Sequence, residues 1–184
     1  MSMKLDIDID NGALEKAEKL LSEVPGGMQT ALMRSMNRAL QEGRTAGTRA
    51  AAKAYTLRAK DVRPTFAMHK ATKSRLDAEL LSRGRNVPLS AYAHKPKTDT
   101  TGANRKQVRV GVKKGGLKPL GQAFISKGRV MQRLGATRLP VEQKYGPSVP
   151  GIIGSDEVSE AVVDTMGKAV EKRLEHETLR LLNK

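Results

Sequence analysis

The chain begins with an alternation of hydrophobic and charged residues. From residue 3 to residue 10 it reads MKLDIDID, in which one leucine and two isoleucines are separated by acidic residues. A period of two is typical of a half-buried β-strand, so this segment predicts a strand. A helix is expected next, because Asn11 suits an N-cap and apolar residues then recur at helical spacing until Pro25-Gly26-Gly27.

The strongest helical pattern runs over residues 28–55. Its apolar stripe begins with Leu32, Met36 and Leu40 and then changes to alanine and glycine, while arginine and lysine occupy the other positions. A stripe of such small residues permits close backbone approach, so this long helix is expected to pack tightly against a sheet or another helix.

Short strand-like segments fill the middle of the chain. Residues 56–64 first predict a cap and one short helical turn that Pro64 ends. Strands of an antiparallel sheet are then expected at 65–71, 75–82, 87–93 and 107–112. The intervening segments 95–105 and 113–119 are rich in turn formers and cations, which predicts exposed loops.

The last third of the chain combines a hairpin, a proline-rich segment and a helix. Residues 123–125 and 130–133 flank the sequence SKGR, which suits a hairpin turn. Three prolines in residues 138–150 predict an extended arm without regular structure. Ser155, followed by two acidic residues, suits the start of a final helix over about residues 155–182.

These elements predict an α+β fold, in which a small antiparallel sheet is packed by the long helix and the C-terminal helix and carries extended loops. A length of 184 residues suits one domain, so we expect a single domain over residues 1–184. Its basic loops lie at about 95–119.

Composition narrows the kind of protein. Aromatic residues make up only 3% of the chain, so the core is expected to be thin and to complete its burial against neighbouring subunits. The absence of cysteine excludes disulfides and thiolate chemistry. No apolar stretch approaches the ~18 residues of a membrane span, which predicts a soluble protein made in the cytoplasm, without membrane contact.

The positive charge is concentrated in the middle of the sequence. Between Arg44 and Arg133 there are 22 lysines and arginines and four acidic residues, whereas the rest of the chain holds 12 basic and 15 acidic residues. Such a basic region favours a polyanion, of which nucleic acid is the commonest. The alternative is an ordinary solvated surface of high isoelectric point.

Candidate chemistry is sparse. His69, His94 and His176 have no second ligand at metal-binding spacing, and the pair His176-Glu177 is interpreted as an exposed helical pair. Paired carboxylates for a metal-dependent nuclease are missing from the basic region. We therefore expect no enzyme activity, no catalytic residues, no cofactor and no metal. Five aromatic residues in all also argue against base stacking.

One stretch of the sequence resembles a known family. The matching motifs are Gly121 to Ile125, Val130 to Arg133, Arg138 to Val141 and Tyr145 to Pro150, followed by a C-terminal helix. In this order they resemble the phage minor tail protein Z family, part of the neck and tail-completion proteins of tailed bacteriophages. The alanine-rich helix and the segment from Tyr55 to Arg63 fit the same family, whereas residues 3–10 and the loop at 95–107 are not explained by it.

The resemblance implies a structural virion protein at the head-proximal end of the tail. It would complete the tail and help join it to the head, as a ring around the DNA conduit with six subunits. Expected partners are further copies of the chain, the tail terminator or tail tube, the head connector or stopper, and viral DNA bound without sequence preference. The alternative is a nucleic-acid-binding accessory or packaging protein.

Two sets of residues are candidates for contacts. The cations expected to face DNA lie in the loops and are Lys95, Lys97, Arg105, Lys106, Lys113, Lys114 and Lys118; alternatively these loops face outward as solvated surface. The residues expected to contact a neighbouring protein lie in the proline-rich arm and are Arg138, Leu139, Pro140, Val141, Tyr145, Pro147, Val149 and Pro150; alternatively the arm packs on its own domain.

Overall fold

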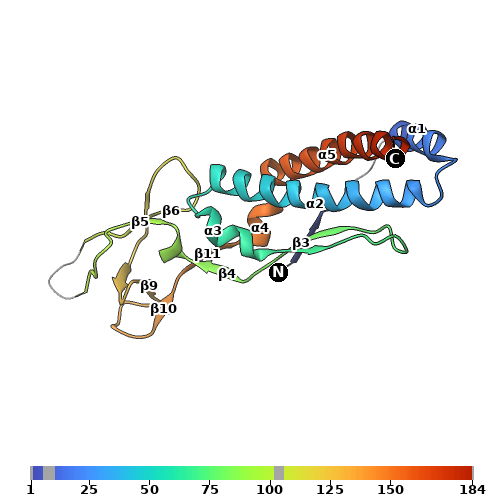
Figure 1. Ribbon diagram of the computed structural model, residues 1–184. Coiled ribbons are helices and arrows are strands. Elements are labelled where there is room, and N and C mark those ends of the chain that lie inside the picture. The colour runs from blue at the N-terminus through green and yellow to red at the C-terminus, as the bar shows by residue number, and fades with distance from the viewer. Residues whose placement is uncertain (1, 6–10, 102–105, 184) are drawn as a thin grey trace.

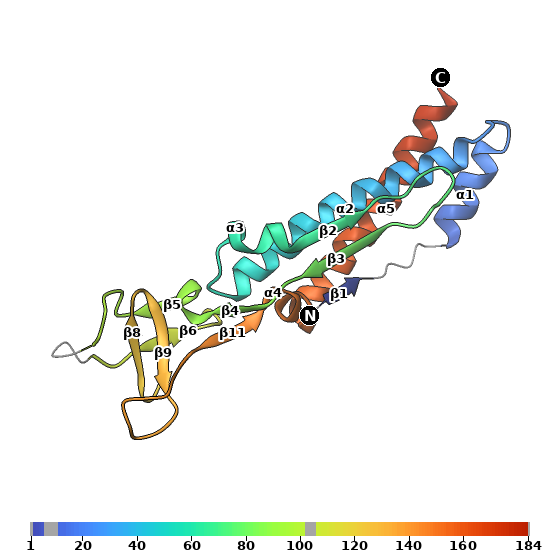
Figure 2. The same ribbon diagram turned by 90° about the horizontal axis from the view of Figure 1, so that it is seen from below.

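A computed structural model describes residues 2–5, 11–101 and 106–183 of the chain. The molecule is elongated (Figures 1 and 2), with long helices at one end and small sheets at the other. We call these the helical end and the β end.

Two long helices form the main axis. Helix α2 (Gly27–Ala54) and helix α5 (Asp156–Leu182) lie side by side and antiparallel (Figure 1), so that Gly43 and Gly47 of α2 meet Met166 and Val162 of α5. Both helices were predicted with nearly these bounds. The small-residue stripe of α2 is what brings their backbones close, as expected from the sequence.

Helix α1 (Asn11–Leu21) lies on α5 near the C-terminus of the chain. Its buried Ala17 and Leu21 form a small apolar cluster with Ala31 of α2 and Leu174 of α5. The chain then turns through Gly26, whose φ of 67° is left-handed and therefore suits glycine.

A three-stranded antiparallel sheet supports the middle of the helices. It contains β1 (Ser2–Leu5), β2 (Phe66–His69) and β3 (Glu79–Arg83), in the order β1-β3-β2. The three strands were predicted but are shorter than expected, and residues 6–10 of the first lie outside the described part. The short helix α3 (Ala59–Val62) precedes β2, and beyond it Pro64 lies inside a 3₁₀ turn, η1 (Arg63–Thr65).

The β end holds three further sheets among the described residues. The segment predicted as one strand over 87–93 is divided by a 3₁₀ turn, η2 (Leu89–Ala91), into β4 (Asn86–Pro88) and β5 (Ala93–Lys95). Strand β5 pairs with β6 (Arg109–Gly111), which pairs with β7 (Lys118–Pro119). The predicted hairpin is confirmed as β8 (Ala123–Ser126) and β9 (Arg129–Arg133), to which β10 (Val141–Gln143) adds a third strand.

The prediction of an irregular arm at 138–150 is wrong. The segment contains β10, β11 (Tyr145–Ser148), which pairs with β4, and the start of helix α4 (Val149–Ile153). Two of its three prolines stand where regular structure tolerates them, and Pro140 lies in the loop before β10. Pro147 lies where the β11–β4 register shifts, and Pro150 lies in the first turn of α4, where Ser148 Oγ accepts a hydrogen bond from the Gly151 amide at 3.2 Å.

One apolar core connects the two ends. Buried residues of the β end, such as Tyr92, Val110 and Ile125, belong to the same cluster as Leu40 and Met166 of the long helices. The α+β class is therefore confirmed, with the strands distributed over several small sheets instead of one.

Candidate nucleic-acid interface

The small sheet β5-β6-β7 brings together cations that are far apart in the sequence. Lys95 lies directly opposite Arg109, whereas Lys118, which is exposed on the edge strand β7, lies opposite Val110 and therefore on the other face of the sheet. Because directly opposite residues of an antiparallel pair point to the same face, Lys95 and Arg109 form a like-charge cross-strand pair.

This sheet is fixed to the end of the long helix. Thr56, two residues after α2, donates a hydrogen bond from Oγ1 to the Gly111 carbonyl at 2.6 Å and accepts one from the Ala93 amide at 3.0 Å. Its own amide donates to the Val112 carbonyl at 3.0 Å. On the inner face, His94 and Val110 are buried, which leaves Lys95 and Arg109 exposed on the other.

The exposed cations in and beside this sheet form what we call the basic surface: Lys95, Lys97, Lys106, Arg109, Lys113, Lys114 and Lys118. No acidic side chain of the described residues forms an ion pair with any of them. Lys113 lies over the Tyr55 ring, 5.8 Å from its centroid, and Lys97 Nζ is 3.4 Å from His94 Nδ1. Asp99 accepts a hydrogen bond from the Lys127 amide at 3.1 Å. Within the described residues, the positive charges of the basic surface are therefore not offset by ion pairs.

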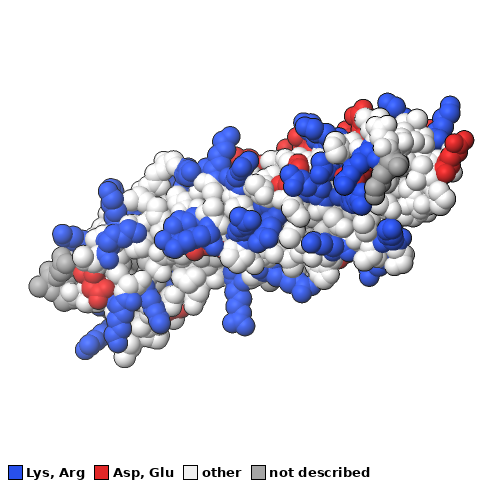
Figure 3. Space-filling model, viewed as in Figure 1, with Lys and Arg blue, Asp and Glu red and all other residues white. Residues whose placement is uncertain are grey.

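The structure places six of the seven predicted cations in or beside this sheet, and Arg105 lies outside the described residues. Figure 3 shows lysine and arginine side chains projecting from the β end, while most acidic side chains in view lie over the helical end. Arg109 was missed, although its place in the alternating segment 107–112 already indicated an outward side chain.

The predicted contact residues separate into two groups. Leu139 is 66% exposed and Tyr145 51% exposed, and Arg138, Pro140 and Pro147 are exposed as well. Val141 is half-buried, whereas Val149 and Pro150 are buried within the chain in α4. The surface available to a neighbour therefore lies mainly in the loop of residues 134–140 between β9 and β10. Leu134, 60% exposed in the same loop, was missed by the sequence analysis.

A model of the prophage minor tail protein Z (GPZ) family matches residues 12–184. The chain belongs to this family. It is therefore a structural protein of a phage tail, which places it in the virion beside other tail components. No curated protein and no solved structure matches the chain.

The three histidines of this minor tail protein Z family member lie in two kinds of environment, because His69 and His176 are exposed and His94 is buried. His69 is exposed at the end of β2, whereas His94 is buried with Nδ1 3.0 Å from the Tyr92 carbonyl oxygen. Within the described residues, no three histidine, cysteine, aspartate or glutamate side chains are grouped to hold a metal ion, and no helix is long and apolar enough to cross a membrane.

The interpretation of His176-Glu177 as an exposed helical pair is wrong for Glu177, which is buried. His176 is exposed, but Glu177 is buried between the two long helices, where its Oε2 is 2.9 Å from Arg34 Nη1 and 3.6 Å from Arg180 Nη1. Burial alone would raise the pKa of Glu177, but the hydrogen bond and charge of Arg34, aided by Arg180 and Arg173, lower that pKa below its ordinary value. This ion pair joins α2 to α5 across 143 residues of sequence.

Tyr92 joins the basic sheet to β11. Its buried hydroxyl donates a hydrogen bond to the Pro147 carbonyl at 2.7 Å, and Gly146 leaves room for its ring because a Cβ there would lie 2.7 Å from a ring carbon. Burial raises the pKa of Tyr92 to about 12, so the hydroxyl remains a donor at physiological pH.

Proposed function

We propose that this protein forms a ring around the DNA conduit at the head-proximal end of the phage tail, where it completes the tail and helps join it to the head. The ring contains six copies of the chain. Its other partners are the tail terminator or tail tube on one side and the head connector or stopper on the other. Before assembly the chain resides in the host cytoplasm. Membership of a family of minor tail proteins supports this proposal.

The observation that carries the DNA part of the proposal is the like-charge pair Lys95 and Arg109, which forms no ion pair with an acid among the described residues. Like charges directly opposite each other in a sheet are unfavourable, and a phosphate placed between them removes that cost. Contacts of this kind are made to phosphate and carry no base information, so they suit a protein past which any sequence must move.

The proposed role is structural and needs no catalytic residue, cofactor or metal. A conduit has to hold the end of the DNA without reacting with it. Charge and shape are sufficient for this, and the exposed cations of the basic surface supply the charge.

A joining assay tests the proposed role. Heads and tails are prepared from a phage that lacks the gene for this chain, and purified chain is added before infectious particles are counted. The proposal predicts that joining depends on the added chain and requires its presence on the tail before the head is added. Tails that join heads equally well without the chain would refute it.

A second candidate function rests on the same basic surface. A nucleic-acid-binding accessory or packaging protein would also need exposed cations that have no acidic partners. The two functions differ in where the chain is found. A tail-completion protein remains with purified tails at high salt, whereas an accessory protein fractionates with DNA and leaves it as salt is raised.

A further inference from the structure

Arginines from the two long helices line one small pocket at the helical end, which we call the arginine pocket. It has a volume of about 260 Å³. Its lining residues are Arg34, Asn37, Arg38 and Gln41 of α2 and Arg173 and Glu177 of α5. Residues four apart in a helix lie on the same side, so Arg34 and Arg38 face the pocket together. Three guanidinium groups therefore share this space with a single carboxylate.

The positive charge of the arginine pocket is only partly neutralised. Arg34 Nη1 donates to Glu177 at 2.9 Å, and Arg38 Nε donates to Glu42 at 2.9 Å in an exposed pair along α2. Arg173 forms no ion pair with a described residue, and its buried Nε has no hydrogen-bond partner among them. Buried N–H groups are normally hydrogen-bonded, so the Arg173 guanidinium is available to an acceptor from outside the chain.

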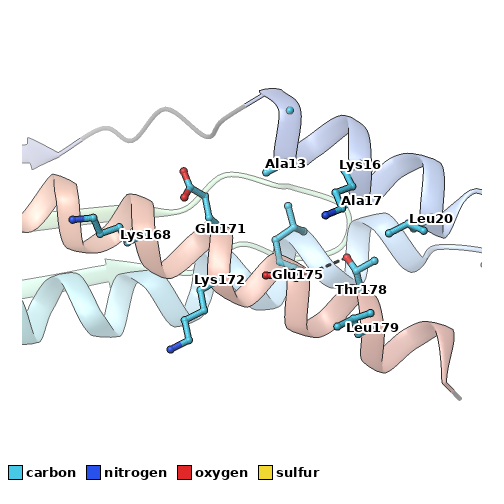
Figure 4. A pocket seen from close by; sticks show the side chains of 12 residues that line it. Ala13, Lys16, Ala17, Leu20, Lys168, Glu171, Lys172, Glu175, Thr178 and Leu179 are labelled. Carbon is cyan, nitrogen blue, oxygen red and sulfur yellow. Dashed lines mark hydrogen bonds between the residues drawn. The ribbon is translucent and has the colours of Figure 1, made fainter.

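The larger pocket of the helical end has no such charge preference. It lies between α1 and α5 with a volume of about 740 Å³, and Figure 4 shows side chains of both signs along it. Lys168 is already paired with Asp164 at 2.8 Å. The charged residues that line this pocket are Lys16, Lys168, Lys172, Glu171 and Glu175. Opposite charges nearly balance there, so an anion is favoured in the arginine pocket and not in the larger one.

We propose that the arginine pocket binds a terminal phosphate group, either inorganic phosphate or the phosphate of a monoester. Arginine recognises phosphate and carboxylate through paired N–H groups. A carboxylate is satisfied by one guanidinium, as Glu177 is by Arg34. Three guanidinium groups around one small volume match the three free oxygens of a terminal phosphate better than the two free oxygens of a phosphodiester.

The arginine pocket is separate from the basic surface. Gln41, the lining residue of α2 nearest to the β end, precedes the end of the helix at Ala54 by 13 residues, which is ~20 Å of α-helix. The sheet that carries the basic surface begins beyond that point. The inference therefore goes beyond the proposed function and does not depend on the ring. A phosphate held by both helices would join α2 to α5 and stabilise the folded chain.

Titration with inorganic phosphate tests the arginine pocket, with NMR as the readout and chloride keeping the ionic strength constant. Phosphate should shift the Nε–H signal of Arg173 to a saturating value. Dimethyl phosphate, a phosphodiester, should bind at least about tenfold more weakly. Arg38→Gln and Arg173→Gln should each weaken phosphate binding by about tenfold. The Arg38 side chain is 52% exposed, so its variant should fold even where Arg173→Gln does not.

Arg49→Gln is the matched control, because Arg49 is exposed on the same helix but does not line the pocket. It should bind phosphate as the wild type does. Glu177→Gln should tighten phosphate binding by at least about threefold, because it removes the negative charge from the pocket. Arginines that serve only to hold the helices together would not give this gain. The absence of saturable phosphate binding, unchanged binding by Arg38→Gln, or equal binding of dimethyl phosphate would overturn the proposal.

Discussion

Gly43 of α2 lies directly against the side chain of Met166 of α5, with no room for a Cβ between them. Four residues further along α2, a Cβ on Gly47 would lie 2.9 Å from the Phe66 ring. The two glycines therefore set the distance between the long helices and the distance from α2 to the sheet beneath. Glycine costs helix stability, so its presence here follows from packing.

Replacing Gly43 with alanine should lower the free energy of unfolding by ~1–3 kcal/mol, because displacing the buried Met166 outweighs the gain in helix propensity. Denaturant titration measures the change. Gly167→Ala is the control, since a Cβ at Gly167 meets no atom within 4 Å. That variant should be more stable by ~0.5–1 kcal/mol. A stabilised Gly43→Ala variant would contradict the described packing.

Replacing Glu177 with glutamine should lower stability at neutral pH by ~1–3 kcal/mol, because Arg34 loses its charged partner in a buried position. The pKa of Glu177 is lowered in the folded state, so its contribution is complete above the ordinary value of 4.5 and is lost as pH falls through the folded-state value. The difference between the two proteins should therefore shrink below pH 4.5. Denaturant titrations across this pH range measure it.

The matched control for Glu177 is Glu175→Gln, two residues earlier on the exposed side of α5. It should change stability by less than ~0.5 kcal/mol at neutral pH, as is usual for surface substitutions. If the two substitutions lowered stability equally, the buried ion pair of Glu177 with Arg34 would not be the cause of the loss.

We propose that the chain unfolds as a single domain, because one apolar cluster runs from Met166 at the long helices to Val110 at the β end. Calorimetry should then give one thermal transition whose calorimetric and van't Hoff enthalpies agree. Two separate transitions, one for the helices and one for the small sheets, would contradict a single domain.

The helices could be predicted from the sequence because their signals are local. The stripes of α2 and α5 and the break at Pro25-Gly26-Gly27 each lie within a few residues of what they determine. The division of the strands into several small sheets could not be predicted from the sequence, because it depends on long-range pairing such as that of Asn86 with Ser148.

The candidate contact surfaces also depend on long-range pairing that the sequence does not show. Composition predicted that the cations lie in exposed loops, but Lys95 and Arg109 become neighbours only through the β5–β6 register. The proline-rich arm was misread because proline argues against regular structure in general, whereas Pro150 occupies the first turn of a helix, where it is tolerated. The exposure of Leu134 depends on the closure of its loop.

Neutralising the basic surface should weaken binding to duplex DNA. In the triple variant Lys95→Gln, Arg109→Gln, Lys118→Gln, the slope of log affinity against log salt should fall by about 0.9 for each phosphate that the variant no longer neutralises. Affinity should fall equally for unrelated sequences. Fluorescence anisotropy with labelled duplexes at several salt concentrations measures both.

The control for this variant removes three exposed lysines from the helical end: Lys19→Gln, Lys70→Gln, Lys73→Gln. It has the same net charge but keeps the basic surface, so it should bind nearly as the wild type does. If both triple variants lose the same affinity and slope, net charge alone explains binding and the basic surface has no special role.

Cryo-electron microscopy of intact particles tests the central claim most directly. The proposal predicts density for this chain as a sixfold ring between the tail tube and the head connector, with Lys95 and Arg109 facing the DNA in the lumen. Particles in which the chain lies elsewhere in the tail, or in which the basic surface faces away from the lumen, would contradict it.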